Sequence, residues 1–220
     1  MSLTILICVH SNTDFHDMLL NKSIISLVNQ TYKNFKTIIV LDECWGKTKK
    51  MIFNSNYGLN LIVIEKNKKT GLSDAKNFGL NLIDTEWVGF LDGDDLYMPN
   101  KIQKQIDYIN NNNVDFLGTK SWYIDGLNET DLYPNFFLNY DEHPYCETHE
   151  EIKKNIFNSN VLTHGSMIIK KKCIDKLGGY YNIKGMEDWD LWKRGILNGF
   201  IFHQLQEKLY IYRRNTSVPL

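Results

Sequence analysis

The stretch Trp87-Val88-Gly89-Phe90-Leu91-Asp92-Gly93-Asp94-Asp95 joins a short apolar run to three carboxylates, and the rest of the chain is best interpreted outward from it. Residues 87–91 are typical of a buried strand. Pro99 follows soon afterwards, and proline suits the first position of a helix. The carboxylates are therefore expected at the end of a strand, where an open α/β sheet has its ligand crevice.

These three carboxylates favour a divalent cation as their partner. Acids close together raise one another's pKa unless a cation neutralises them. Mg²⁺ and Mn²⁺ are suitable cations because they take carboxylate and phosphate oxygens as ligands. An acidic turn is the alternative interpretation, since Asp and Gly are common turn residues. The stretch by itself leaves both interpretations open.

Composition narrows the class of protein. A chain of 220 residues forms one large domain or two small ones, and 43% hydrophobic residues is ordinary for a globular core. The formal net charge of -1 provides no global field toward nucleic acid or an anionic membrane, so we expect no nucleic-acid partner.

The cysteines and the apolar runs indicate the cellular compartment in which the protein is expected. The four cysteines are far apart and form no C-x-x-C pair, which argues against a zinc site and a disulfide framework and fits a reducing compartment. No run approaches the roughly 20 apolar residues that span a bilayer, and no basic region precedes the first apolar run, as a signal peptide would require. We therefore expect a cytoplasmic protein with at most peripheral membrane contact.

Strands and helices alternate over the first 98 residues. Apolar runs predict strands at 3–9, 37–41, 59–64 and 87–91, and helical spacing predicts helices at 17–30, 45–56 and 72–83, the last with Ala75, Phe78 and Leu82 on one face. This alternation predicts a parallel sheet with helices on both faces. Right-handed crossovers bring the strand ends to one edge. The polar residues after those ends should share one crevice: the loop that begins at His10, Asp42, the basic loop 66–71 and Asp92–Asp95.

The pattern changes after residue 99. We expect a helix at 101–111, an extended segment at 114–124, a helix opening at 148–151, a strand at 166–169, a helix at 171–177 stopped by two glycines, and one or two strands in 200–212. Residues 125–145 have no periodicity but many aromatic rings, which argues against disorder. Such rings either bind the apolar faces of sugars or fill a small core.

A second acidic pair, Glu187-Asp188, suits the first turn of a helix in which Leu191 and Ile196 face inward. The helix dipole favours acids at this position, so simple capping is one interpretation of the pair. A catalytic carboxylate is the other interpretation.

Four stretches of the chain now form an ordered set: 26–32 with 38–42, 71–79 (GLSDAKNFG), 90–95, and 178–180 with 187–192. A single stretch of this kind is unspecific, but the four in this order resemble the inverting nucleotide-sugar glycosyltransferases of family 2, which have the GT-A fold. The resemblance covers roughly residues 3–215. It implies one glycosyltransferase domain over 1–220, with a nucleotide-sugar-binding half (1–98) and an acceptor-binding half that holds the catalytic base (99–220). Its sheet should be central and mostly parallel, with helices on both faces.

The resemblance also implies a role for each candidate residue. Asp42 would contact the nucleobase, usually uracil, and Asp92 and Asp94 would lie at the ribose and diphosphate. Asp94 or Asp95 would hold Mn²⁺ or Mg²⁺, and Asp188, beside Glu187, would be the general base. The donor-binding set is completed by His10, in the loop after the first strand, and by Lys76.

The expected reaction is metal-assisted transfer of a sugar, with inversion, from a nucleotide-sugar donor to an acceptor hydroxyl. A UDP-sugar is the favoured donor, and the acceptor is a glycan, a lipid-linked glycan or a protein. We expect the acceptor side at residues 125–145 and 164–166. Two positions depart from the family pattern: Lys76 stands where Arg is usual, and Asn215 stands where His is common. Lysine keeps the charge but lacks the bidentate fork of arginine.

Other functions fit less well. A nucleotidyltransferase would more often have a glycine-rich basic loop after the first strand, where this chain has residues 10–13 (HSNT). The G-x-G-x-x-G of a dehydrogenase and a phosphate-binding P-loop are both missing from the sequence. A binding-only protein with the same fold remains an alternative, although the presence of both acidic stretches argues against it.

Overall fold

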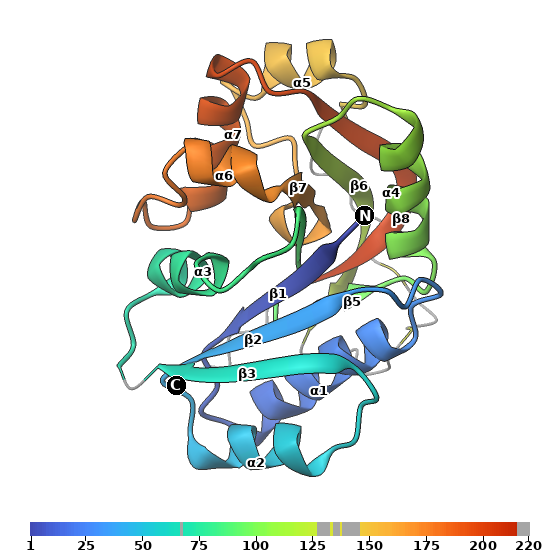
Figure 1. Cartoon of the computed structure of the whole chain (residues 1–220). Coiled ribbons are helices and arrows are strands. Elements are labelled where there is room, and N and C mark those ends of the chain that lie inside the picture. The colour runs from blue at the N-terminus through green and yellow to red at the C-terminus, as the bar shows by residue number, and fades with distance from the viewer. Residues whose placement is uncertain (67, 127–132, 134–136, 138–145, 215–220) are drawn as a thin grey trace.

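The computed structural model of the chain describes residues 1–66, 68–126, 133, 137 and 146–214 (Figure 1). One sheet of eight strands runs through the molecule in the order β3-β2-β1-β4-β7-β6-β8-β5. The strands are β1 (Leu3–Val9), β2 (Lys36–Asp42), β3 (Asn60–Lys66), β4 (Trp87–Phe90), β5 (Leu96–Tyr97), β6 (Phe116–Asp125), β7 (Ile168–Lys170) and β8 (Phe202–Arg214).

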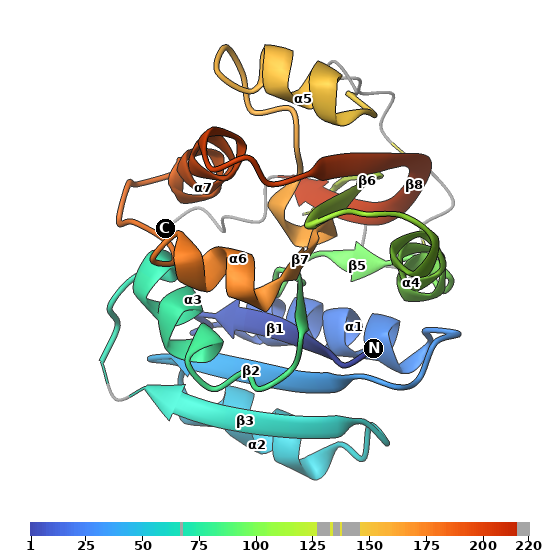
Figure 2. The ribbon, with the colours of Figure 1, turned by 45° about the horizontal axis from the view of Figure 1, so that its top comes forward.

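The sheet is mostly parallel, as predicted. Strands β3, β2, β1 and β4 are parallel neighbours, and the view in Figure 2 shows the first three side by side. Strands β6 and β8 are also parallel to each other, whereas β7 runs antiparallel to β4 and β6, and β5 runs antiparallel to β8. Residues of both predicted halves therefore contribute to one continuous sheet.

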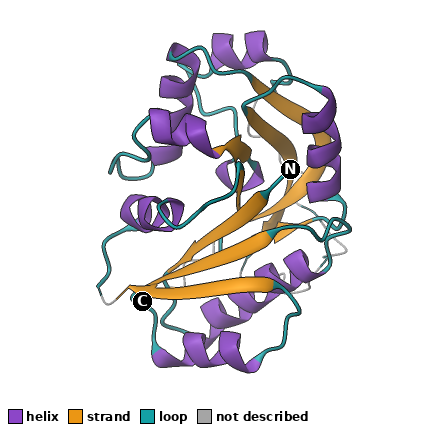
Figure 3. Ribbon diagram, in the orientation of Figure 1, coloured by secondary structure: helices purple, strands orange, loops and turns teal. Residues whose placement is uncertain are grey.

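Helices cover both faces of the sheet (Figure 3). The helices are α1 (Asp14–Val28), α2 (Gly46–Asn54), α3 (Leu72–Leu80), α4 (Lys101–Asn111), α5 (His149–Asn155), α6 (Lys171–Lys176) and α7 (Glu187–Leu197), with a short 3₁₀ turn, η1, at His164–Ser166. One core contains apolar side chains of α1, α2 and α4, and the other contains those of α3, α5, α6 and α7. No described helix is long and apolar enough to cross a membrane.

Local signals explain most helix ends. The Thr13 side chain accepts a hydrogen bond from the His16 amide, so α1 begins three residues earlier than predicted. Thr148 and Glu151 form a capping box at the start of α5. Gly178 and Gly179, both with positive φ, end α6 as expected. All four cysteines lie in the described part of the chain and are free thiols, as predicted.

Helix α4 begins at Lys101, as predicted, two residues after Pro99. The predicted face of α3 was wrong in part: Ala75 is buried, but Phe78 and Leu82 are 37% and 43% exposed. The helix packs through Gly79 instead: a Cβ there would lie 2.5 Å from the Leu6 side chain, so the helix backbone approaches the sheet closely.

Candidate functional site

A pocket of about 750 Å³ opens at the carboxyl ends of β1 and β4. This volume lies in the usual range for small-molecule sites. Seven of the eight candidate residues line it: His10, Lys76, Asp92, Asp94, Asp95, Glu187 and Asp188. The two acidic stretches, about ninety residues apart in the sequence, therefore lie in one pocket.

Asp95 is buried and bonded to strand β8. Its Oδ1 accepts a hydrogen bond from the Arg213 amide at 2.6 Å, and its Oδ2 accepts one from the Tyr210 hydroxyl at 2.5 Å. Burial, followed by the neighbouring Asp94 and Asp92 charges, raises the pKa of Asp95. Both carboxylate oxygens therefore already have protein donors.

The Tyr210 hydroxyl also determines which residue can follow His164. A Cβ built on Gly165 would lie 1.9 Å from this hydroxyl oxygen, so only glycine fits while Tyr210 remains bonded to Asp95. The Tyr210 hydroxyl is thus enclosed between Asp95 and Gly165 of the η1 turn. Asp95, Tyr210 and Gly165 form one packing unit that fixes β8 against the pocket.

Asp94 and Asp92 face the pocket with fewer protein contacts. Within the described residues, no hydrogen bond or ion pair engages the Asp94 carboxylate, and Asp92 has a single long contact of 3.5 Å from the Tyr210 hydroxyl. The pKa of Asp92 is raised to about 6. Burial is the largest cause, the Lys76 charge opposes it, and the charges of Asp94, Asp188 and Glu187 contribute to the rise.

The described residues offer no group of three or more His, Cys, Asp or Glu side chains arranged to hold a metal. One or two carboxylates nevertheless fit Mg²⁺-type sites, in which substrate phosphates and water supply the other ligands. Asp94, with Asp92 beside it, meets that description. Asp95 meets it less well because it is only 2% exposed and both of its oxygens accept hydrogen bonds from β8.

Asp188 and Glu187 begin helix α7 and have different surroundings. Asp188 accepts hydrogen bonds from the Trp189 amide at 2.7 Å and from Asn160 Nδ2 at 3.0 Å. Burial raises the pKa of Asp188, and Lys76 is the main influence that lowers it. Glu187 is buried and forms an ion pair with Lys76, with Nζ and Oε1 3.1 Å apart. This pair joins α7 to α3.

Asp42 does not line the pocket. Its two carboxylate oxygens accept hydrogen bonds from the Thr70 and Gly71 amides at 3.2 Å each, and the Lys66 ammonium lies 3.8 Å away. His10 Nδ1 lies 2.9 Å from the Asp42 carbonyl oxygen. Asp42 therefore fastens the loop before α3 to the end of β2, and its contact with a nucleobase stays a prediction.

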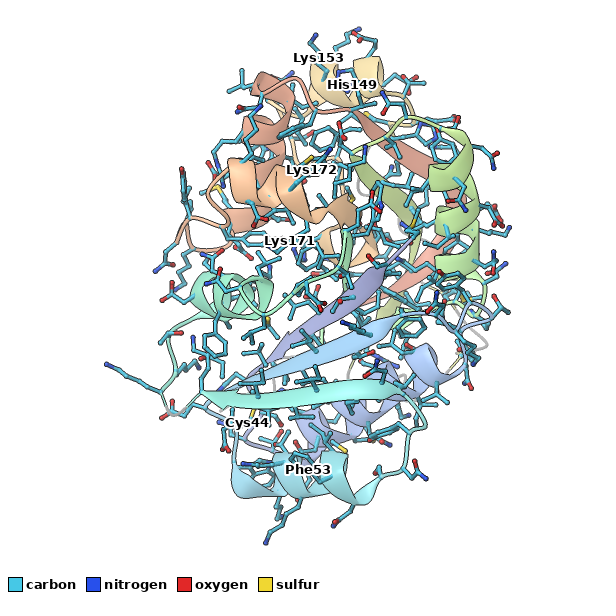
Figure 4. The ribbon with its side chains drawn as sticks, viewed as in Figure 1. Cys44, Phe53, His149, Lys153, Lys171 and Lys172 are labelled. Carbon is cyan, nitrogen blue, oxygen red and sulfur yellow. The ribbon has the colours of Figure 1, made fainter. Side chains whose placement is uncertain are left out.

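Nearby, Cys44 connects the loops after β1 and β2. Its Sγ accepts a hydrogen bond from the Ser11 amide at 3.2 Å and donates to the Val9 carbonyl at 3.3 Å. Figure 4 labels Cys44 beside the carboxyl ends of the parallel strands. The loops around the pocket are thus tied to one another by side chains as well as by the sheet.

The sequence profile of the family described as Glycosyl transferase family 2 matches residues 4–178. The chain belongs to glycosyltransferase family 2. An uncharacterized glycosyltransferase of Methanocaldococcus jannaschii is 30% identical over 88% of this chain and 65% of its own length. The O-antigen biosynthesis glycosyltransferase WbnJ of Escherichia coli is 28% identical over 96% of this chain and 79% of its own.

The fold of this family 2 glycosyltransferase chain is the GT-A fold. The crystal structure of TarS 1-349 of S. aureus in complex with UDP-GlcNAc is similar with a TM-score of 0.79 and 17% identity, over 99% of this chain and 60% of that one. The predicted family and fold are both confirmed. The chain spans 65% of the length of the archaeal relative and 60% of TarS 1-349.

The expected acceptor side of the glycosyltransferase is only partly described. His164 lines the pocket, and its Nε2 lies 2.8 Å from the Tyr180 hydroxyl; burial lowers the pKa of His164, which keeps the ring neutral. Most of 125–145 lies outside the described residues. Its described rings, Tyr133 and Phe137, pack against a small core, and Phe137 stacks on Trp122 at 4.4 Å.

Several pocket residues of the glycosyltransferase were not predicted from the sequence. They include Cys8, His16, Tyr123, Asn160, Thr163, Tyr212, Arg213 and Arg214. Residues 213–214 had a visible signal, because two adjacent arginines follow the last predicted strand (200–212), but no role was assigned to them. Asn160 belongs to no motif, and only its contact with Asp188 draws attention to it.

Proposed function

We propose that this chain transfers a sugar from a nucleoside-diphosphate donor to an acceptor hydroxyl, with inversion at the anomeric carbon and UDP as the favoured nucleotide. The observation that carries the proposal is the single pocket in which Asp94, without a protein partner among the described residues, and the hydrogen-bonded Asp188 both lie. One carboxylate suits the donor diphosphate and its cation. The other suits the acceptor.

Asp188 acts as the general base in this proposal. A hydroxyl is a poor nucleophile until its proton is removed as the new bond forms. The acceptor oxygen attacks the anomeric carbon while Asp188 takes its proton, and the bond between that carbon and the donor phosphate oxygen breaks. The electron pair of the broken bond leaves with the nucleoside diphosphate. A single displacement of this kind inverts the anomeric centre and needs no covalent enzyme intermediate.

Asp94, with Asp92 beside it, would hold Mn²⁺ or Mg²⁺ together with the donor diphosphate. Such a cation supplies Lewis-acid neutralisation of the charge that develops on the leaving group. Asp95 supports this site indirectly, through its bonds to β8. Lys76 and Glu187 form a buried pair in the pocket lining, and Lys76 adds positive charge near both acidic stretches.

The acceptor is proposed to be a glycan of a surface polysaccharide, either free or lipid-linked. The O-antigen role in the name of the Escherichia coli relative supports this class over a protein acceptor. The UDP-GlcNAc bound by TarS supports UDP as the donor nucleotide. The acceptor would approach beside Asp188, along the wall that contains Asn160, Thr163 and His164.

A thermal-shift panel with UDP, GDP, CDP and dTDP, each with and without Mn²⁺, tests the donor half of this proposal. A ligand that binds only the folded state at a hundredfold excess over its dissociation constant stabilises the protein by about 2.7 kcal/mol. We expect a shift with UDP that requires Mn²⁺. A UDP-sugar should also be hydrolysed slowly, because many transferases pass the sugar to water. Absence of both effects in folded protein would favour the binding-only alternative.

A further inference from the structure

Asn160 lines the pocket and contacts the carboxylate of Asp188. It lies between α5 and η1, far from α7 in the sequence, and its Nδ2 donates to Asp188 Oδ2 at 3.0 Å. Its Oδ1 accepts a hydrogen bond from the Leu162 amide at 3.4 Å. The two contacts together set the orientation of the amide, because the reversed orientation would place two oxygens face to face at Asp188 and two N–H donors face to face at Leu162.

The segment that contains Asn160 is tied to α7 at a second point. Trp189, the residue after Asp188, donates its indole N–H to the Ile156 carbonyl at 2.5 Å. The Trp189 amide in turn donates to Asp188 Oδ1 at 2.7 Å. Each oxygen of Asp188 therefore has one protein donor. A carboxylate oxygen accepts more than one hydrogen bond, so each oxygen keeps capacity for a substrate hydroxyl.

We propose that Asn160 is a positioning residue for the transfer reaction: it holds the Asp188 carboxylate in the orientation that receives the acceptor proton. This inference rests on the proposed role of Asp188 as general base. The Trp189 donor belongs to the same helix as Asp188 and moves with it. Asn160 is the donor that comes from a different segment, between α5 and η1, so it fixes the carboxylate relative to that segment of the pocket lining.

The charges around Asp188 give this role a measurable signature. Lys76 faces it from α3, Glu187 precedes it on α7, Asp92 lies after β4, and Tyr180 lies after α6. Burial raises the pKa of Asp188, while Lys76, the Trp189 amide and the Asn160 hydrogen bond lower it. Loss of the Asn160 donor therefore raises this pKa. A base is active only when deprotonated, so the acid limb of the rate profile should move to higher pH.

The experiment compares Asn160→Ala and the nearly isosteric Asn160→Asp with the wild type. Asn158→Ala is the matched control, because Asn158 is exposed in the same segment and does not line the pocket. UDP release from UDP-GlcNAc and UDP-glucose is measured from pH 5 to 9. We expect kcat at pH 6 to fall about tenfold to hundredfold, the range for a lost hydrogen bond to a charged group. The acid limb should move upward in both variants, further in Asn160→Asp, with little change in KM for the donor.

A titration that needs no substrate keeps the inference falsifiable. The side-chain carboxyl carbons of ¹³C-labelled aspartate are followed by NMR, with Asp188→Asn identifying the Asp188 signal. Asn160→Ala should raise the pKa of Asp188, and Asn158→Ala should leave it unchanged. Unchanged titration and an unchanged acid limb in folded Asn160 variants would overturn the positioning role alone. Full turnover by Asp188→Asn would instead overturn the proposed function.

Discussion

The two acidic stretches of the pocket, Asp94-Asp95 and Glu187-Asp188, share one arrangement but are held by different contacts. In the stretch after β4, Asp95 is bonded to β8 on both oxygens, whereas its neighbour Asp94 has no protein partner among the described residues. At the start of α7, Glu187 is buried and paired with Lys76, whereas its neighbour Asp188 is only half-buried at the pocket. In each pair, one carboxylate is buried and engaged within the protein, and the adjacent one is more exposed and available to substrate.

The comparison also contains a difference. Backbone and phenol donors hold Asp95, and these are neutral groups, whereas a buried ammonium holds Glu187. Asp94 has no protein donor in the described chain, while Asp188 has two. A cation-binding carboxylate gains from such freedom because the cation and its phosphate ligands can set the geometry. A general base gains from fixed geometry, because proton transfer requires a defined distance.

The largest effect should come from replacing Asp188, the available carboxylate at the start of α7. Asp188→Asn keeps the size of the side chain but cannot accept a proton as a base. We expect turnover to fall about 10²–10⁴-fold, the usual contribution of general base catalysis, with unchanged thermal shifts by nucleotide and Mn²⁺. The measurement is UDP release together with the thermal-shift panel.

Glu187→Gln is the partner experiment for Asp188→Asn. It should lower the free energy of unfolding by about 1–3 kcal/mol, less than the 3–5 kcal/mol for an isolated buried pair, because Asp92 and Asp188 also face Lys76. Its turnover should fall much less than that of Asp188→Asn. Equal losses of turnover in Glu187→Gln and Asp188→Asn would contradict the different roles given to Glu187 and Asp188.

Replacing Asp95 should mainly affect stability, whereas replacing Asp94 should mainly affect the response to metal. Asp95→Ala leaves the Arg213 amide and the Tyr210 hydroxyl without their acceptor, which should cost about 1–3 kcal/mol in the free energy of unfolding, measured by urea denaturation. Asp94→Ala should have near wild-type stability but lose the Mn²⁺-dependent shift with UDP. If Asp94→Ala kept the full Mn²⁺ response and folded Asp95→Ala lost it, the metal assignment would move to Asp95.

The smallest effect concerns Asp92, and its sign is opposite to the usual one for an acid. Burial raises the pKa of Asp92 to about 6 in the folded protein, so ionised Asp92 opposes folding. Asp92→Asn should therefore increase the free energy of unfolding at pH 8. The gain should be about 1–2 kcal/mol, below the roughly 3 kcal/mol of a two-unit shift, because water screens a partly exposed group.

The pH dependence of this gain checks its origin. The stability that protonated Asp92 contributes in the wild type is complete below pH 4 and is lost as the pH rises through about 6. The difference between Asp92→Asn and the wild type should thus vanish at low pH and reach a plateau above pH 7. Urea denaturation at several pH values measures it, and a gain that is the same at pH 4 and pH 8 would point to packing instead of charge.

The sequence predicted the elements that carry the pocket carboxylates but not the residues that contact those carboxylates. The strand before Asp92 and the helix that starts at Glu187 were both predicted, and their acids line one pocket, whereas Asp42 and the described residues of the loop 66–71, expected in the same crevice, do not line it. Helical spacing grouped Phe78 with Ala75 on one face of α3, but the close approach of Gly79 to the sheet decided the packing. Asn160 carried no local signal at all.

The sequence by itself determined the alternation of strands and helices, the edge at which polar residues gather, and the family. These features depend on local periodicity and on short motifs, which are visible without coordinates. Only the tertiary structure decided which acid is engaged and which is available. Arg213 reaches Asp95 across 118 residues, and Lys76 reaches Glu187 across 111. Such contacts depend on how distant segments pack, and no periodic pattern in the chain encodes them.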